Sequence, residues 1–407
     1  MNAPLPALRP RPRQFGHRQV GRNGSVLVVV MVTLIFAVTA LVVFMDKATN
    51  DLLVEQRAAV ARRLRMEAYS ALEVTLAVLE EFRRVGNGLH SPAEGWSDPL
   101  TFASYVPTEA RTVDVAFEDE SGRISLPRAD AAMLTNLFKN WLIPENDATA
   151  LADALAGWMK KEHIYSTGLR PRYEQSAIPY AEPHRSLRSF RELSAIDKVR
   201  EMFFDEEGRP NEWWRRFVDS VSLLDFQRPN INGARPDTLA TLGQFDPIGQ
   251  QNVDDYLKGT GSYQTQGPGY FRNASDAQQI AGTTGSTGSF GTAISALRIT
   301  ITVHEGSSQF RLAAVIAPPN GATIVQTTAT AQRTQTSAPT ARNATAAQNQ
   351  RNPVPPNSPN PAVSNNRQNA PGTSTDRNLR YPFTLLEVRE NDEISQPSPP
   401  PADKREK

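Results

Sequence analysis

The longest apolar run of the chain covers residues 26–45, where twenty consecutive residues carry no charge. A helix of that length rises about 30 Å, which matches the hydrocarbon core of a bilayer. A secretory signal has a shorter apolar segment with a small-residue cleavage site behind it, and Met45, Asp46 and Lys47 offer no such site. The run therefore predicts a single membrane-spanning helix.

An apolar stripe continues beyond this run. Residues 46–85 contain neither Pro nor Gly, and their apolar side chains recur mostly in steps of three and four. The stripe is formed by Leu52, Leu53, Val60, Leu64, Ala68, Ala71, Leu72, Leu76, Leu79 and Phe82. We predict one helix over 25–85, with 25–45 in lipid and the last part packed on a globular domain.

Farther along, apolar and polar residues alternate with the period of strands. Residues 113–117 alternate in this way, and 124–126 do so again after a polar turn, which predicts a β-hairpin. Two more strands are predicted within 294–318, with a turn at 306–308, and a last strand at 379–390.

Between these strands the spacing is helical. Residues 129–230 read mainly as helices, with Asp147 and Ser186 as N-caps, and 228–257 read as a packed pair of helices. Residues 258–292 are rich in Gly, Ser, Thr and Gln and predict a loop. Low-complexity composition predicts disorder over 325–378 and in a tail over 391–407.

Charge is distributed unevenly along the chain. The net charge is +1, which is too balanced to suggest nucleic acid as a bulk partner. Five arginines and no acidic residue precede the pair Gly24-Ser25. Because basic flanks stay in the cytoplasm, residues 46–407 should lie on the other side of the membrane. The chain has no cysteine, which excludes disulfides and thiolate metal sites.

The N-terminal region has the organisation of a processed membrane anchor. A basic leader over 1–24, a glycine directly before an apolar helix, and the continuation of that helix into a head resemble type IV pilins and type II secretion pseudopilins. In that superfamily a prepilin peptidase cuts after the glycine and methylates the new N-terminus. The resemblance therefore implies cleavage between Gly24 and Ser25.

The fifth mature position narrows the resemblance. Most members have glutamate there, whereas this chain has Val29. The departure is typical of the minor pseudopilin K of the type II secretion system (GspK). In an assembled filament the glutamate is thought to neutralise the buried amine of a neighbour, and an unpaired buried charge is costly. A subunit with valine at this position suits the start of a filament, at its tip.

The segment RPNINGARPDTLATL (228–242) resembles a signature of the second helical subdomain of GspK. The residues that fall on this pattern are Asn230, Ile231, Asn232, Ala234, Pro236, Leu239 and Leu242. The signature also resembles helix-hairpin-helix DNA-binding modules. However, Asp246, Asp254 and Asp255 lie where a phosphate would need positive charge, so we expect no nucleic-acid partner.

The resemblance implies an α+β fold. A long pilin-like N-terminal helix would pack on a small antiparallel sheet, with a large all-α domain of SAM-like or helix-hairpin-helix-like type inserted between strands. The head would then comprise 86–128 and 293–390, and the inserted domain 129–285.

The resemblance also implies a function. The chain would be a minor pseudopilin at the tip of the type II secretion pseudopilus, where it would initiate assembly for protein export across the outer membrane, and it would not be an enzyme. Its partners would be minor pseudopilins of the I and J types, the prepilin peptidase and the inner-membrane assembly platform. It would cross the inner membrane once, with the N-terminus cytoplasmic and the head periplasmic. A type IV pilus minor pilin and a signal-anchored periplasmic enzyme or adaptor are the alternatives.

Candidate chemistry is sparse in the sequence. No two histidines stand four residues apart, and neither a Walker sequence nor G-x-S-x-G is present, so no catalytic residue is assigned. The family resemblance brings in calcium, because GspK heads bind it through clustered carboxylates. The densest acidic clusters, 118–120 and 205–207, are interpreted as solvated turns. We therefore expect no cofactor and assign no calcium ligand.

Overall fold

The computed structural model describes residues 23–108, 111–166, 168, 170–175, 179–282, 285–325 and 382–391. The predicted leader up to residue 22, almost all of the predicted disordered insert, and the tail from residue 392 lie outside the described residues. The chain divides into two compact units, one ending at Arg63 and the other beginning at Leu64.

The N-terminal helix α1 covers Asn23–Gly86, which confirms the helix predicted over 25–85. In the first unit the apolar side chains of residues 26–45 are exposed. In the second unit the predicted stripe is buried, at Leu64, Ala68, Ala71, Leu72, Leu76 and Leu79. Burial of this stripe supplies the stability that helix propensity alone would not.

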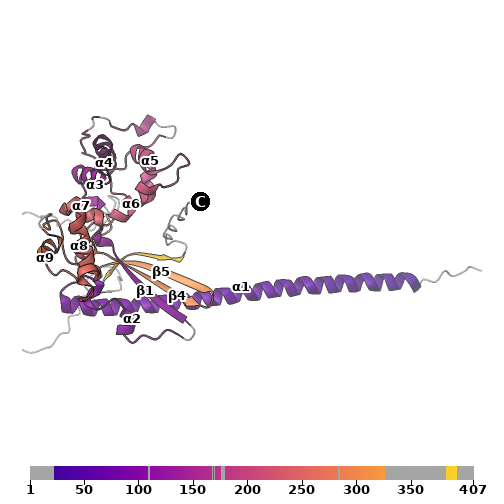
Figure 1. Ribbon diagram of the computed structural model, residues 1–407. Coiled ribbons are helices and arrows are strands. Elements are labelled where there is room, and N and C mark those ends of the chain that lie inside the picture. Colours follow the sequence, from indigo (N-terminus) through magenta and orange to yellow (C-terminus); the bar gives the residue numbers. More distant parts are fainter. Residues whose placement is uncertain are drawn as a thin grey trace, which may run out of the picture. The chain divides into compact units, whose positions relative to one another are not determined.

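Four strands form one antiparallel sheet in the order β1-β4-β5-β6. Their bounds are Arg111–Asp119 for β1, Leu297–Glu305 for β4, Ser308–Ala317 for β5 and Thr384–Glu390 for β6. The strands predicted within 294–318 and 379–390 are thereby confirmed. Alternate residues of β4 are buried from Leu297 to Val303, which is the pattern of a sheet with one covered face. In Figure 1 the end of α1 runs beside these strands.

The predicted hairpin at 113–126 is wrong. β1 pairs with β4 along its whole length, from Arg111 opposite Glu305 to Asp119 opposite Leu297. The return segment forms β2 (Ile124–Ser125), which pairs in parallel with β3 (Val221–Ser222) in a separate two-stranded sheet. Local alternation predicted both strands, but it could not identify partners about 100 and 180 residues away.

Helices occupy the chain between β2 and β4. Their bounds are Ala131–Asn140 for α3, Glu145–Met159 for α4, Asp197–Phe203 for α5, Glu212–Ser220 for α6, Pro236–Gly243 for α7, Pro247–Lys258 for α8 and Ala274–Ala281 for α9. The short helix α2 (Pro99–Phe102) follows α1. The mixed helix-and-sheet fold confirms the predicted α+β class, whereas the predicted domain boundaries stay a prediction.

Several local predictions in this region are corrected. Helix α4 begins after Pro144 and has no side-chain cap, so Asp147 lies within its first turn. Residues 190–195 form a 3-10 helix capped by Ser189, and Ser186 caps nothing. Helix α9 lies within the stretch predicted as loop. The prediction missed it because its eight residues are flanked by glycine-rich sequence, which dominates the composition of the stretch.

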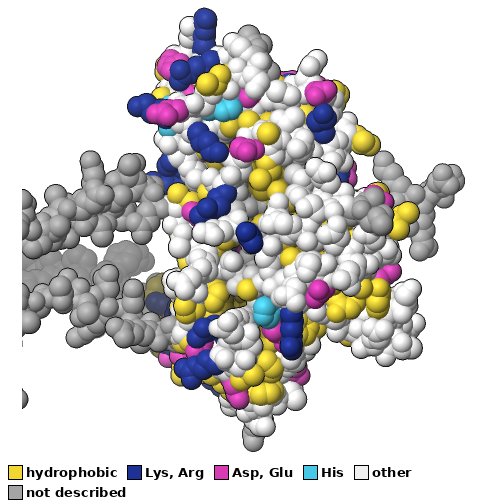
Figure 2. All heavy atoms as spheres, turned by 90° about the vertical axis from the view of Figure 1, so that its left-hand side faces the viewer, with side chains coloured by type: hydrophobic (Ala, Val, Ile, Leu, Met, Phe, Trp, Pro, Cys, Tyr) yellow, Lys and Arg dark blue, Asp and Glu magenta, His cyan; other side chains and the backbone are white. Residues whose placement is uncertain are grey.

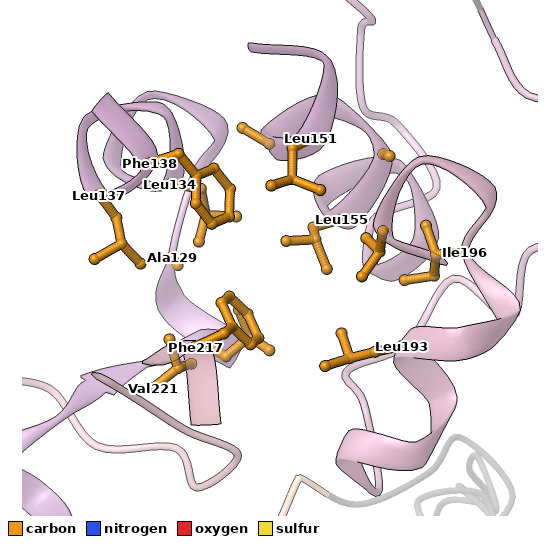
Figure 3. Close-up of a cluster of buried hydrophobic side chains, with 14 of the residues drawn as sticks. Ala129, Leu134, Leu137, Phe138, Leu151, Leu155, Leu193, Ile196, Phe217 and Val221 are labelled. Atoms are coloured by element: carbon orange, nitrogen blue, oxygen red, sulfur yellow. The ribbon is translucent and has the colours of Figure 1, made fainter. Parts of the chain in front are cut away.

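Two apolar cores hold the helices together. In the larger core, side chains from α3, α4 and α6 converge with Leu193 and Ile196, and Phe138 lies among them (Figure 3). In the smaller core, Leu239 of α7 and Val253 of α8 pack with Ile231, which precedes α7, and with α9. This packing confirms that 228–257 contains a packed pair of helices. On the face shown in Figure 2, acidic and basic side chains are interspersed and exposed apolar side chains form small separate groups.

Candidate functional site

The predicted processing site lies at the start of α1. Gly24 and Ser25 are the second and third residues of the helix, and Val29 lies one turn further, with 60 % of its surface exposed. No charged residue stands between Val26 and Met45. One 18-residue window of this helix has a mean hydropathy of 3.1, so the helix is long and apolar enough to cross a membrane. Cleavage at Gly24 stays a prediction.

In the second unit, Glu67 of α1 joins the helix to the sheet. Its carboxylate accepts hydrogen bonds from the Tyr105 hydroxyl at 2.6 Å and from the Thr108 hydroxyl at 2.7 Å, and it pairs with Arg111 of β1 at 2.9 Å. Burial disfavours the charged form of Glu67, but these hydrogen bonds outweigh burial and hold its pKa below the usual value. Arg111 also pairs with Glu305 of β4, so one network, with Glu67 and Arg111 at its buried centre, connects α1 with two strands.

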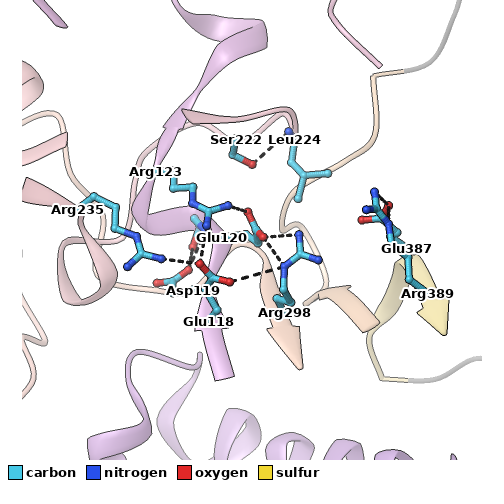
Figure 4. A network of polar contacts seen from close by, with 11 residues as sticks. Glu118, Asp119, Glu120, Arg123, Ser222, Leu224, Arg235, Arg298, Glu387 and Arg389 are labelled. Atoms are coloured by element: carbon cyan, nitrogen blue, oxygen red, sulfur yellow. Dashed lines mark hydrogen bonds and ion pairs between the residues drawn. The ribbon is translucent and has the colours of Figure 1, made fainter. Parts of the chain in front are cut away.

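A second network lies where β1 leads into the helical region. Glu120 is only 3 % exposed and pairs with Arg123 and with Arg298 of β4, while Glu118 pairs with Arg123 and Arg235 (Figure 4). The interpretation of 118–120 as a solvated turn is therefore wrong. This burial could not be predicted from the local sequence, because two of the three arginines come from distant segments.

Asp119 lies within the same junction. Its carboxylate accepts hydrogen bonds from the Ser121 amide and hydroxyl and from the Asn230 side chain, at 2.6–2.8 Å. Removal of the carboxylate from water nevertheless raises its pKa to about 6, above the ordinary 3.8. Through the hydrogen bond from Asn230, the residue connects β1 to the segment before α7.

The NINGARPDTLATL motif fastens the α7–α8 pair to the sheet. Asn230 donates to the His90 carbonyl at 3.0 Å in addition to Asp119, and Asn232 donates to the carbonyls of Phe271 and Thr292 at 3.0 Å. At the turn between the helices, the Asp246 carboxylate accepts from the Gly249 amide at 2.7 Å. An acidic side chain of the chain itself thus occupies the place where a helix-hairpin-helix module would hold a phosphate.

The other acidic cluster is a solvated turn, as interpreted from the sequence. Asp205 and Glu207 both pair with Arg209, and these side chains are exposed. Among the residues that the structure describes, no group of three or more His, Asp or Glu side chains is placed to hold a metal ion. A calcium ligand is therefore assigned neither to this turn nor to the junction at 118–120.

Comparison with protein families gives a match that covers the junction at 118–120 and the helices that follow it. Residues 117–206, from the end of β1 to beyond α5, match the family model of "Type II secretion system (T2SS), protein K". This segment is therefore similar to protein K of the type II secretion system. The match confirms the resemblance to protein K that was predicted from the sequence, and it lies in a different part of the chain from Val29 and the motif at 228–242.

The chain was also compared with solved structures and with curated proteins. The chain is similar to a chain of the GspK-GspI-GspJ complex from the enterotoxigenic Escherichia coli Type 2 Secretion System, with 12 % sequence identity and a TM-score of 0.43. This similarity covers 67 % of the present chain and 97 % of the other. No curated protein matches the chain.

Proposed function

We propose that this protein K homologue is the minor pseudopilin at the tip of a type II secretion pseudopilus, where it starts assembly and thereby supports protein export across the outer membrane. The observation that carries the proposal is the protein K match at 117–206 in a chain whose apolar helix has Val29 at the fifth mature position. The chain acts by binding and performs no turnover.

The role of Val29 follows from electrostatics. In the pilin-like superfamily, a glutamate at this position is thought to neutralise the terminal amine of a neighbouring subunit in the filament. Valine offers no such charge, and leaving a neighbour's amine unpaired in an apolar bundle would be costly. A subunit with valine is therefore favoured at the first position, where it has no neighbour's amine to pair.

The head supports docking because its elements are fastened together. Buried ion pairs join α1 to β1 through Glu67 and Arg111, and Glu120 joins the end of β1 to β4 through Arg298. Such a head presents a preorganised surface, which reduces the ordering cost of association. The proposed partners are minor pseudopilins of the I and J types, with the inner-membrane platform receiving the anchored helix.

Processing and orientation complete the proposal. A prepilin peptidase would cleave between Gly24 and Ser25 on the cytoplasmic side and methylate Ser25. The arginines before this site would hold the N-terminus in the cytoplasm, with the head in the periplasm and the span in the inner membrane.

The decisive experiment is mass spectrometry of the N-terminus of the chain purified from membranes of its host. A mature chain that begins with methylated Ser25 is expected. Gly24→Leu should abolish this product, whereas the matched variant Gly21→Leu should be processed normally. An uncleaved N-terminus, or cleavage beyond Met45, would overturn the proposal.

A second experiment addresses the tip. The processed chain should co-purify with the I- and J-type pseudopilins, and removal of the chain should reduce the number of assembled pseudopili. Co-purification should survive Val29→Leu, which keeps an apolar side chain at this position. Failure of the wild-type chain to retain either pseudopilin would contradict the tip role while leaving the processing result unaffected.

A further inference from the structure

A polar cavity lies where β1 ends, beside the segment that precedes α7. Its volume of about 240 Å³ has room for several water molecules or for one alkyl chain with a polar end. His90, Glu118, Asp119 and Arg235 belong to its lining, and Figure 4 shows the last three close together. The charges of this lining therefore decide which ligand the cavity can hold.

Asp119 is the acid of the lining that lacks a cationic partner. Glu118 pairs with Arg235, so these two charges balance each other. The Asp119 carboxylate accepts hydrogen bonds from Ser121 and Asn230, which are neutral. Within the described parts of the chain, no basic side chain pairs with this carboxylate. A cationic ligand would supply the partner that Asp119 lacks.

His90 supplies a second acceptor. Its Nδ1 atom lies 2.8 Å from the Thr292 carbonyl oxygen, which can only accept a hydrogen bond. The neutral ring therefore carries its hydrogen on Nδ1 and leaves Nε2 as an acceptor. The Asn230 amide nitrogen donates to Asp119 Oδ2 at 2.7 Å and to the His90 carbonyl at 3.0 Å, which holds the two residues side by side. Two such acceptors favour a ligand with several hydrogen-bond donors.

Another part of the lining suits an alkyl stem. It is formed by Pro92, Phe117, Ile294 and Leu297. The Phe117 ring is held edge-on by Trp96, with ring centroids 5.0 Å apart. An apolar wall of this kind buries methylene groups, and the face of an aromatic ring attracts a cation.

We propose that this cavity binds a primary alkylammonium group, which pairs with Asp119 and donates to His90 Nε2 while its stem packs on Phe117. An anion fits less well, because two carboxylates and one guanidinium give the lining a net negative charge. A divalent metal ion also fits less well, since no three His, Asp or Glu side chains of the described residues are placed to hold one. A lysine side chain of another protein and a free amine offer the same chemistry, and neither depends on the pseudopilus role.

Saturation-transfer NMR on the purified full chain in detergent, at pH 7.5, tests the ligand class. Nα-acetyl-lysine-N-methylamide should bind about 10- to 100-fold more tightly than the norleucine analogue, which has the same stem without the ammonium group. Tighter binding of the lysine analogue than of n-butylamine identifies a protein side chain as the source, and equal or tighter binding of n-butylamine identifies a free amine. Equal affinities for the lysine and norleucine analogues, or no binding of either amine, would overturn the proposal.

The pH dependence tests the role of Asp119. Burial raises its pKa to about 6, so the carboxylate loses its charge as pH falls through this value. The lysine analogue should therefore bind about tenfold more weakly at pH 5 than at pH 7.5, because the fraction of ionised Asp119 falls by about that factor. The other charged or titratable groups around Asp119 are Glu118, Glu120, Arg123, Arg235, Arg298 and His90.

Two variants separate these contributions. Histidine is the residue type that ordinarily changes charge in this range, so His90→Gln, which keeps an acceptor, removes that titration, and the tenfold change should persist. Asp119→Asn should lower the affinity at pH 7.5 by about tenfold or more and remove its pH dependence, whereas Asp114→Asn, exposed on the same strand, should bind like the wild type. A pH-independent affinity in wild type or in His90→Gln, or wild-type affinity in Asp119→Asn, would overturn the proposal. Normal cleavage at Gly24 alongside any of these results would leave the proposed function intact.

Discussion

The two halves of α1 are both rich in apolar residues but meet different surroundings. Large apolar side chains within residues 26–45 are 51–77 % exposed, whereas Leu64, Leu72, Leu76 and Leu79 are at most 4 % exposed. The first half is apolar on all sides and needs an apolar solvent, which a bilayer supplies. The second half is apolar along one stripe and is covered by its own unit. The same secondary structure thus serves an anchor and a core element.

Truncation in the second half should have the largest effect. Leu79 is fully buried, and Leu79→Ala should lower the free energy of unfolding of the head by about 2–5 kcal/mol, because the substitution leaves a cavity. Chemical denaturation of the full chain in detergent, followed by tryptophan fluorescence, measures this loss. Val85→Ala is the matched control, since Val85 is 87 % exposed on the same helix. Its free energy of unfolding should differ from the wild-type value by less than about 0.5 kcal/mol. Equal losses in both variants would show that the stripe does not form the core.

A charge in the first half should instead affect insertion. Ile35 lies near the middle of the apolar run, and Ile35→Arg should disfavour membrane insertion by about 2.5–3.5 kcal/mol. Carbonate extraction of membranes measures the fraction that remains inserted, with Ile35→Leu as the control. Denaturation of the head should be unchanged in both variants. Full insertion of Ile35→Arg would contradict a membrane position for this half.

The stability of the second unit should also depend on pH, through Asp119. Its pKa is raised to about 6, so its contribution to stability is fully present below the unfolded value near 3.8 and is lost as pH rises through about 6. Relative to Asp119→Asn, the wild-type head should gain roughly 1–2 kcal/mol of unfolding free energy between pH 7.5 and pH 5. Parallel denaturation curves across this range measure the difference.

Asp114→Asn provides the control for the pH experiment, because Asp114 is exposed on the same strand. Its curves should follow those of the wild type at each pH. A constant offset between wild type and Asp119→Asn, without a pH-dependent part, would refute the assignment of this titration to Asp119.

Local periodicity predicted most elements of the fold and the pairing of neighbouring strands, but not the pairing of strands that are distant in the sequence. The stripe from Leu64 to Leu79 predicted the buried side of α1, and the alternation in β4 and β5 predicted that pair, because each signal lies within one short segment. The pairing of β1 with β4 crosses about 180 residues and leaves no trace in local alternation. The hairpin prediction failed for this reason.

The candidate site shows the same limit. Gly24, Ser25 and Val29 are predicted from their order in the sequence, which requires no knowledge of the fold. The burial of Glu120 depends on Arg298, and the raised pKa of Asp119 depends on a junction with the segment around Asn230.

The smallest expected effect concerns the edge of the sheet that rests against the second half of α1. The Tyr69 hydroxyl donates to Glu390 of β6 at 2.6 Å, and Arg65 pairs with the same carboxylate at 2.9 Å. The hydrogen bond from Tyr69, followed by the contact with Arg65, lowers the pKa of Glu390, so this contribution is present above the unfolded pKa near 4.5 and is lost as pH falls. Because Arg65 is 56 % exposed, solvent screens the pair.

Tyr69→Phe should therefore cost at most about 1 kcal/mol of unfolding free energy at pH 7. A double-mutant cycle with Glu390→Gln isolates the coupling between the two side chains, and its value should decrease when the pH is lowered toward 4. A coupling of zero at pH 7 would mean that the hydrogen bond from Tyr69 does not stabilise the edge strand. The polar contact between α1 and β6 would then consist of the ion pair between Arg65 and Glu390.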